Sequence, residues 1–284
     1  MADGILSIQS AVAYGHVGNS AAVFPLQRQG FEVWPVNTVL FSNHTGYGVW
    51  RGHVVGLDQV AEILEGVRER GAFGRCRAVV SGYLGTPDLG DLVLRTVASI
   101  RELRPDLIWA CDPVMGDEGR GFFVKPGIPE FFKARALPAA DIVTPNQFEL
   151  AYLADMAIVD VESAVAAARR VRAQGPRIVV CTSLTAGVAE GELAVLADTA
   201  DGSWLVRTPR LEIELNGTGD AFTALFLGNW LRTGDVAVSL SDAVASMYAL
   251  VEATKRSGER ELQLVACQDA LVAPPRRFTV ERIG

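Results

Sequence analysis

The sequence predicts an α/β fold in which a mostly parallel central sheet is covered by helices on both faces. Two observations carry this prediction. Short apolar runs of strand length alternate along the chain with longer segments whose apolar residues recur at helical spacing. Several of the strand-like runs end in a serine, a threonine or an acid, which is the pattern expected where the carboxyl ends of parallel strands face a ligand. Alternation of this kind favours crossover connections and parallel pairing.

The first half of the chain supplies four strand-like and three helix-like segments. Residues 57–71 show the helical period most clearly, because Val60, Ile63, Leu64 and Val67 share one face. Pro35 lies inside a strand-like run, where it indicates a bend or an edge position. The expected strands cover residues 4–10, 31–41, 76–85 and 106–113, and the expected helices cover residues 19–30, 57–71 and 89–105.

The second half continues the alternation and then changes to a hairpin. Two apolar runs on either side of the turn "TADGS" are typical of paired antiparallel strands. Gly175 closes an alanine-rich helical segment. The expected strands cover residues 140–146, 177–184, 192–198 and 203–209, and the expected helices cover residues 148–155, 161–175, 218–234 and 240–258.

Composition narrows the class of protein. The chain has 284 residues, of which 49% are hydrophobic, and it shows no linker, repeat or low-complexity tract, so we expect one domain over residues 1–284. The net charge of -7 argues against nucleic-acid binding. The four cysteines form no CxxC pair, and we find neither a signal-peptide pattern nor an apolar run of the ~20 residues that span a membrane. We therefore expect a cytoplasmic protein with no membrane partner.

The most informative motif is "NGTGDAF", where Gly217, Thr218 and Gly219 precede Asp220 and an apolar helical run. Glycines permit close backbone approach and positive φ, and a helix start offers free N–H groups to an anion. One interpretation is therefore a phosphate cradle beside a carboxylate base. The alternative is that Asp220 only caps the helix. Two glycines in front of the acid favour the cradle, because a plain cap does not need them.

This motif resembles the anion hole of the ribokinase-like superfamily, whose members phosphorylate hydroxymethyl groups with ATP. Further stretches are similar to the pyridoxal kinase family and span nearly the whole chain: "SIQSAVAYGHVGNSAAVFPLQRQGFEVWPVNTVLFSNHTGYG", "SGYLG", "CDPVMGDEG", "DIVTPNQFEL" and "ELQLVACQD". The resemblance implies a ribokinase-like fold and ATP-dependent phosphorylation of the 5-hydroxymethyl group of pyridoxal, which gives pyridoxal 5'-phosphate for vitamin B6 salvage.

The resemblance also implies roles for individual residues. Asp220 would be the catalytic base, and the three residues before it would form the anion hole. The residues expected at the pyridoxal ring are Ser10, Val17, His44, Thr45, Gly46 and Tyr83. The residues expected at ATP are Asp112, Thr144, Asn146, Glu149, Thr182, Thr208, Pro209, Arg210 and Leu211. Asp112 and Glu149 would also serve Mg2+, and a monovalent cation is a further candidate cofactor. The expected partners are pyridoxal, ATP and a second copy of the chain in a homodimer.

Structural alternatives remain for several of these residues. Ser10 and Asp112 could end strands in turns, Tyr83 could be surface packing, and His44 could be a satisfied loop residue. "TPNQFE" could be a helix start in which Asn146 and Glu149 have no other role.

The chain departs from some family members at two places. Thr182 stands where some bacterial members carry lysine, and Val124 stands where some carry an aromatic residue. The span "MGDEGRGFFVKPG" is nevertheless the candidate for a mobile cover over ATP.

Three other functions compete. Hydroxymethylpyrimidine kinases have a similar ring pocket, a vitamin B6 carrier could share the fold without catalysis, and a dinucleotide-binding dehydrogenase shares the fold class. The last would need a G-x-G-x-x-G turn after the first strand, which is absent.

Overall fold

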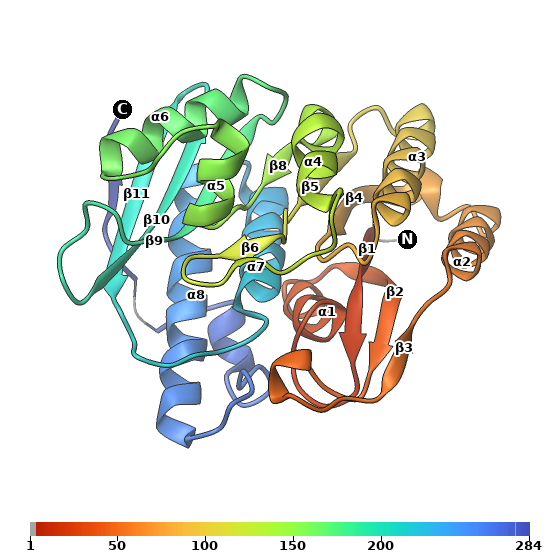
Figure 1. The fold of residues 1–284 in the computed structure, drawn as a ribbon, viewed down its shortest axis with the longest axis horizontal. Helices are drawn as coiled ribbons and strands as arrows, with labels where there is room; N and C mark the ends of the chain where they lie inside the picture. Colours follow the sequence, from red (N-terminus) through yellow and green to blue (C-terminus); the bar gives the residue numbers. More distant parts are fainter. Residues whose placement is uncertain (1–3, 276) are drawn as a thin grey trace.

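The computed structural model describes residues 4–275 and 277–284, and one ten-stranded sheet runs through it (Figure 1). The strand order is β12-β11-β10-β9-β8-β5-β4-β1-β2-β3. Six neighbouring strands pair in parallel: β1 (Gly4–Val12), β2 (Glu32–Phe41), β4 (Cys76–Ser81), β5 (Ile108–Cys111), β8 (Ile142–Val143) and β9 (Ile178–Leu184). The other four pair antiparallel at the two ends: β3 (Gly52–Val54), β10 (Glu192–Thr199), β11 (Gly202–Pro209) and β12 (Val280–Arg282).

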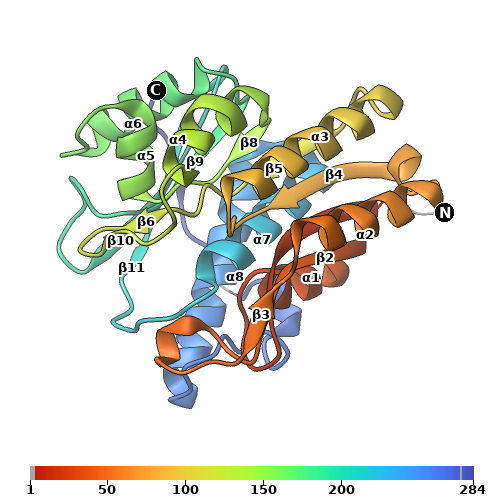
Figure 2. The ribbon, with the colours of Figure 1, turned by 45° about the vertical axis from the view of Figure 1, so that its right-hand side comes forward.

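Helices cover both faces of the sheet, and each face has its own hydrophobic core. One core is covered by α2 (Leu57–Glu69), α3 (Pro87–Leu103), α4 (Ile128–Phe131), α5 (Gln147–Ala154) and α6 (Val161–Arg172). The other is covered by α1 (Asn19–Arg28), α7 (Thr218–Thr233) and α8 (Val236–Ser257). Figure 2 shows the two helical layers with the sheet between them. The predicted fold class is therefore confirmed.

Short elements fill the connections. They are the hairpin of β6 (Gly116–Asp117) and β7 (Gly121–Phe122), and the short helical turns η1 (Thr45–Tyr47), η2 (Phe73–Arg75), η3 (Phe132–Ala136), η4 (Leu137–Ala139) and η5 (Gln268–Leu271). The β6–β7 hairpin lies within the span expected to form a cover. Sequence patterns did not predict β3, β6, β7 or β12, because each is two or three residues long and too short to show a period.

Two predicted features of the strands are confirmed. Pro35 pairs with Ser7 of β1, while β3 pairs only with Val39, Leu40 and Phe41, so Pro35 occupies the edge-like part of β2. The hairpin of β10 and β11 has the expected antiparallel register around its turn. Proline has no N–H to donate to a neighbouring strand, which suits an edge position, and the glycine-containing turn suits a hairpin.

The long helix α8 begins one turn earlier than predicted. Asp235 precedes it and accepts a hydrogen bond from the Val238 N–H at 3.0 Å, so this acid is the cap that sets the start. Among the described helices, α8 is long and apolar enough to cross a membrane by length and composition. The search of the sequence for apolar runs had not identified this segment. Half of that segment is buried, and α8 packs on α7 and the sheet, as a core helix does.

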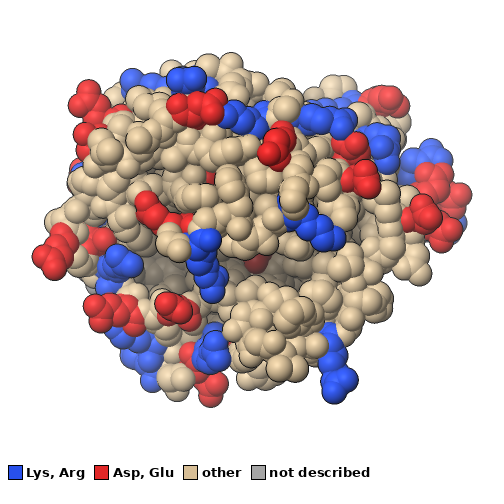
Figure 3. Space-filling view, viewed as in Figure 1, with Lys and Arg blue, Asp and Glu red and all other residues tan. Residues whose placement is uncertain are grey.

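The sheet reverses its order at β1, because β2 lies on one side of it and β4 on the other. Crevices at such a reversal, beyond the carboxyl ends of the strands, are where ligands bind in this class of sheet. Figure 3 shows a hollow across the middle of this face of the molecule, with acidic atoms visible inside it. The carboxyl ends of β1, β4 and β5 carry three of the residues that we expected at a site, Ser10, Tyr83 and Asp112.

Candidate active site

The start of α7 is shaped by Gly217. Its φ of 79° is a left-handed value, and a Cβ at this position would lie 1.8 Å from the His16 carbonyl oxygen. Only glycine fits both constraints. Gly219 differs, because it has no positive φ and its Cβ would lie 3.4 Å from Asp112 Oδ2, an ordinary contact. The expectation of positive φ is thus confirmed at Gly217 and wrong at Gly219, which lies inside the helix.

Asp220 does not cap its helix. Gly217 occupies the cap position, and no side chain there accepts a capping hydrogen bond. The Asp220 carboxylate turns instead toward the β1–α1 loop, where its Oδ2 accepts the Gly18 N–H at 2.8 Å. The capping alternative for this acid is therefore wrong, and the role of base stays a prediction.

Burial raises the pKa of Asp220, and the hydrogen bond from Gly18 opposes that rise. Asp220 is half-buried as a residue, and protein surrounds its carboxylate closely. A Cβ on Gly82, which follows β4, would lie 3.3 Å from Asp220 Oδ1. Gly82 therefore leaves the second carboxylate oxygen free of a side chain on that side.

A second acid, Asp112, follows β5 and lies deep beside the same helix. It is buried, and burial raises its pKa well above the usual range, with the charges of Glu149 and Asp220 adding to the rise. A hydrogen bond with the Thr223 side chain opposes this. Thr223 in turn shares a 2.8 Å hydrogen bond with Thr144. Asp112 and Thr144 are thus brought together with α7, as predicted.

The Glu149 carboxylate is hydrogen-bonded to backbone N–H groups around it. Its carboxylate accepts the N–H groups of Met115 at 2.8 Å and Gly116 at 3.4 Å, and that of Asn146 at 2.9 Å. The Asn146 side chain in turn accepts a hydrogen bond from the Glu149 N–H. The two bonds together form a capping box at the start of α5. Burial raises the pKa of Glu149 to about 7. The helix-start interpretation of these two residues is therefore confirmed, and their roles toward ATP and metal stay predictions.

Asn146 also ties the β6–β7 hairpin to the site. Its side-chain amide donates to the Gly116 carbonyl at 2.8 Å and to Asp117 Oδ1 at 3.3 Å. Thr182 pairs beside Asn146 in a parallel bridge, so these two predicted residues are neighbours. The hairpin, α5 and the end of β9 therefore form one wall.

The predicted stretch from Thr208 to Leu211 lies at the end of β11. Thr208 is buried and pairs with Leu193, and the Arg210 N–H donates to the Gly191 carbonyl at 2.8 Å. Within the described residues, these backbone contacts run to β10 and the turn before it, not to Asp112 or Asp220. A role of this stretch toward ATP stays a prediction.

On the opposite wall, Val17 lies against the start of α7, and Ser10 lies against Gly18, the partner of Asp220. A Cβ on Gly18 would lie 2.6 Å from Ser10 Oγ, and one on Gly217 would lie 3.2 Å from the Val17 Cα. The strand register shifts between Gln9 and Ala11, at Ser10 itself. The structure therefore brings Val17 to the Gly217 turn and Ser10 to the loop that binds Asp220.

The predicted ring residues of the second loop lie in and before η1. His44 caps this turn, since its Nδ1 accepts the Gly46 N–H at 3.1 Å, and burial lowers its pKa. Thr45 and Gly46 are exposed, and a Cβ on Gly46 would lie 3.6 Å from Asn216 Nδ2. The turn thus faces the residue just before Gly217. Tyr83 is half-buried and directly follows Gly82, whose Cβ position lies 3.3 Å from Asp220 Oδ1.

Some residues of the site escaped sequence reasoning. Gln9 is buried, and a Cβ on Gly82 would lie 2.6 Å from its Oε1. Its alternation with Ser7 in an otherwise apolar strand was a usable signal. Thr223 was equally readable, because it lies three residues after Asp220 on the same helix face. Glu261, which bonds both His16 and Tyr47, opens the family-like stretch "ELQLVACQD", but its spacing gave no sign of these two partners.

Within the described residues, no three His, Cys, Asp or Glu side chains converge to hold a metal ion by themselves. The donors near α7 are carboxylate and hydroxyl oxygens, which suit a hard cation such as Mg2+. Their mutual repulsion at Asp112 is also what a cation would relieve. These residues therefore fit a metal that is carried mainly by another ligand, such as a phosphate chain.

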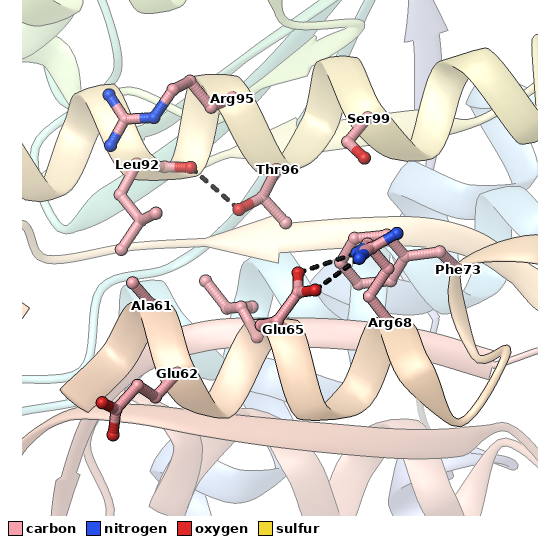
Figure 4. Close-up of a pocket in the computed structure, with 10 residues that line it drawn as sticks. Ala61, Glu62, Glu65, Arg68, Phe73, Leu92, Arg95, Thr96 and Ser99 are labelled. Carbon is pink, nitrogen blue, oxygen red and sulfur yellow. Dashed lines mark hydrogen bonds and ion pairs between the residues drawn. The ribbon is translucent and has the colours of Figure 1, made fainter. Parts of the chain in front are cut away.

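A surface groove of about 470 Å³ lies elsewhere, between α2 and α3 (Figure 4). An ion pair between Glu65 and Arg68 lies at its edge. None of the predicted site residues lines this groove, so we do not regard it as the candidate active site.

Comparison with known proteins gives a consistent result. Residues 34–264 match the family model described as phosphomethylpyrimidine kinase. The chain is 57% identical to pyridoxal kinase PdxY of Rubrobacter xylanophilus, over 99% of this chain and 97% of that one, and 50% identical to pyridoxal kinase PdxY of Deinococcus radiodurans, over 98% and 96%.

Solved structures agree. Pyridoxal kinase from Leishmania donovani in complex with ADP and pyridoxamine superimposes with a TM-score of 0.93 at 34% identity, over 99% of this chain and 100% of that one. A putative phosphomethylpyrimidine kinase from Bacteroides thetaiotaomicron superimposes with a TM-score of 0.91 at 25% identity, over 99% and 98%. The chain belongs to the pyridoxal kinase family and has its ribokinase-like fold.

Proposed function

We propose that this chain transfers the γ-phosphoryl group of ATP to the 5-hydroxymethyl group of pyridoxal, giving pyridoxal 5'-phosphate and ADP. The observation that carries the proposal is the position of Asp220. Its carboxylate is fixed by Gly18 at 2.8 Å, directly beside the free backbone N–H groups at the start of α7. Relatives that are 57% and 50% identical over nearly the whole chain are pyridoxal kinases.

The residues divide the reaction between them. Asp220 accepts the proton of the vitamer hydroxyl as its oxygen bonds to the γ-phosphorus, and the bond from that phosphorus to the bridging oxygen of ADP breaks. The first intrahelical bond of α7 runs from the Ala221 N–H to the Gly217 carbonyl, so the N–H groups of Thr218 and Gly219 are free of helix bonds. They are placed to hold the charge of the transferred group.

Mg2+ belongs to the proposal, since a chain with three lysines and a net charge of -7 has little positive charge to offset a triphosphate. We favour Asp112 as the side chain that holds the ion through water, because it is buried next to Gly219 and, within the described residues, does not bond backbone N–H groups in the way Glu149 does. Mg2+ would neutralise the phosphates during transfer. Removal of the metal with EDTA should abolish turnover.

A second function, phosphorylation of hydroxymethylpyrimidine, is favoured by one observation. The matching family model is described as phosphomethylpyrimidine kinase, and one superimposed structure is a putative phosphomethylpyrimidine kinase. The third function, a non-catalytic vitamin B6 carrier, leaves the fixed carboxylate beside the cradle without a purpose.

One assay separates the three functions. ATP consumption is measured with pyridoxal, pyridoxine, pyridoxamine and hydroxymethylpyrimidine side by side. Fastest turnover with a B6 vitamer supports the proposal. Fastest turnover with the pyrimidine would support the second function, and tight binding of vitamers without turnover would support a carrier.

We also propose a homodimer in the cytoplasm. The dimer rests on the resemblance to the family, and the location rests on composition and cysteine usage. Sedimentation equilibrium tests the dimer, and fractionation of cells that express the native gene tests the location.

A further inference from the structure

Glu261 lies in the segment after α8 and holds two loops at once. Its Oε2 accepts the His16 N–H at 2.8 Å, and its Oε1 accepts the Tyr47 hydroxyl at 2.6 Å. The two partners are 245 and 214 residues away along the chain. In Figure 1 this blue segment lies beside the orange η1 turn. One carboxylate therefore joins three parts of the sequence.

The first loop that Glu261 holds is the one behind the phosphate cradle. The His16 carbonyl is the oxygen that leaves no room for a Cβ on Gly217, and Gly18 donates to Asp220. The loop packs so closely on the Glu261 carboxylate that a Cβ on Gly15 would lie 2.2 Å from its Oε2. The bond to His16 therefore fixes a loop that contacts both the cradle and the proposed base.

The second loop is η1, which carries Thr45. The Tyr47 ring makes an edge contact with Tyr14 at 6.3 Å between centroids, and the Arg260 guanidinium lies 4.5 Å from its centre. The Tyr47 hydroxyl, which is protonated at neutral pH, donates to Glu261, and this hydrogen bond raises the pKa of Tyr47 to about 12. Glu261 and the rings around it thus set the position of this turn.

We propose that Glu261 is a positioning residue for phosphoryl transfer, and this rests on the proposed function. By binding His16 and Tyr47 together, it holds the vitamer-facing turn η1 at a fixed distance from Asp220 and the Gly217 turn. Such alignment matters because misplacement of reacting groups by about 1 Å can cost on the order of 10²-fold in rate. Both carboxylate oxygens of Glu261 accept hydrogen bonds from the two loops, so its proposed effect on the reaction passes through these loops.

The test compares four proteins: wild type, Glu261→Ala, Tyr47→Phe and the matched control Glu259→Ala. Glu259 is an exposed acid two residues away in the same segment. Tyr47→Phe removes one neutral hydrogen bond and keeps the ring, so we expect a rise in pyridoxal KM of roughly three- to tenfold, with ATP KM unchanged. Glu261→Ala removes both bonds, so pyridoxal KM should rise and kcat should fall. The control should match wild type.

A double variant makes the test specific. If Tyr47 acts through Glu261, adding Tyr47→Phe to Glu261→Ala should change pyridoxal KM no further. Additive effects, an unchanged pyridoxal KM in both single variants, or equal rises in the KM of ATP and pyridoxal would overturn the proposal. If Glu261→Ala does not fold, Tyr47→Phe alone decides by the same split between the two KM values. A wild type that phosphorylates no vitamer would instead refute the proposed function.

Discussion

The two walls of the candidate site are built in different ways. We call the wall of Asp112, Thr144, Asn146 and Glu149 the nucleotide wall, after the ATP that we predict there. The wall of the β1–α1 loop and η1 is called the vitamer wall, after the pyridoxal that we predict there. The nucleotide wall includes a capping box between residues three positions apart and a bond from Asn146 to Gly116, 30 residues away. The vitamer wall has short-range bonds as well, such as that from the Gly46 N–H to His44 Nδ1, but it also depends on three bonds that span 202 to 245 residues. One wall forms largely from nearby chain, and the other needs both ends of the protein.

This difference has a physical consequence. A segment that is buried and bonded to its own helix unfolds only when that helix unfolds. Loops that depend on a few bonds to distant side chains have a lower free energy of local unfolding. The vitamer wall should therefore be the more mobile and the more easily damaged of the two. The walls meet at the start of α7, where Asp220 bonds Gly18 and Gly219 lies against Asp112.

The largest effect is expected at that meeting point. Asp220→Asn keeps the size of the side chain but removes the proton acceptor, so kcat should fall ~10²–10⁴-fold, the usual contribution of a general base. Pyridoxal affinity, measured by equilibrium binding, should change little. A variant that retains more than about half of the wild-type kcat would remove Asp220 from the mechanism.

Gly217→Ala should come next, because it damages both walls at their junction. The new methyl group would meet the His16 carbonyl, and the left-handed backbone costs on the order of 1–2 kcal/mol. We expect kcat to fall and the melting temperature to drop.

Gly234→Ala is the matched control for this change. Gly234 ends the same helix at φ 65°, with nothing within 4 Å of its Cβ position. It should lose some stability but keep kcat. Equal loss of kcat in the two variants would mean that strain alone, not the cradle, explains the effect.

Asp112→Asn should alter the nucleotide wall alone. Loss of the charge should raise the Mg2+ concentration needed for half-maximal rate on the order of tenfold, which corresponds to about 1.4 kcal/mol. Glu149→Gln is the comparison, because its amide would face backbone N–H groups at one oxygen position, and it should lower the melting temperature more. Unchanged metal dependence in Asp112→Asn would contradict the assignment.

The smallest effect is expected on the vitamer wall. Thr45→Val keeps the shape and removes one hydroxyl, which should cost roughly 0.5–1.5 kcal/mol of pyridoxal binding and leave ATP KM unchanged. Ser10→Ala should behave in the same way. If neither variant shifts pyridoxal KM, the ring is bound elsewhere.

The two walls also differ in how much of them the sequence could reveal. The capping box and the glycine turn could be predicted, because each depends only on residues within a short stretch, "TPNQFE" and "NGTGDAF". The alternation of strands and helices likewise gave the fold, while β3 and β12 were too short to show a period. The bonds of Asp220 to Gly18 and of Glu261 to His16 could not be predicted, because no spacing relates residues more than 200 positions apart. The resemblance to the family supplied the vitamer residues, but not what holds them.

The central claim is that the Asp220 carboxylate removes the proton of the hydroxyl, and the pH dependence of kcat tests it most directly. Burial raises the pKa of this group above its usual range, and a base works only when deprotonated. Single-turnover rates at saturating ATP, Mg2+ and pyridoxal should therefore fall as pH decreases through that raised pKa, by about tenfold per unit below it. The residual rate of Asp220→Asn should lack this inflection. The same inflection in Asp220→Asn would contradict the account and assign the titration to another acid, such as Asp112 or Glu149.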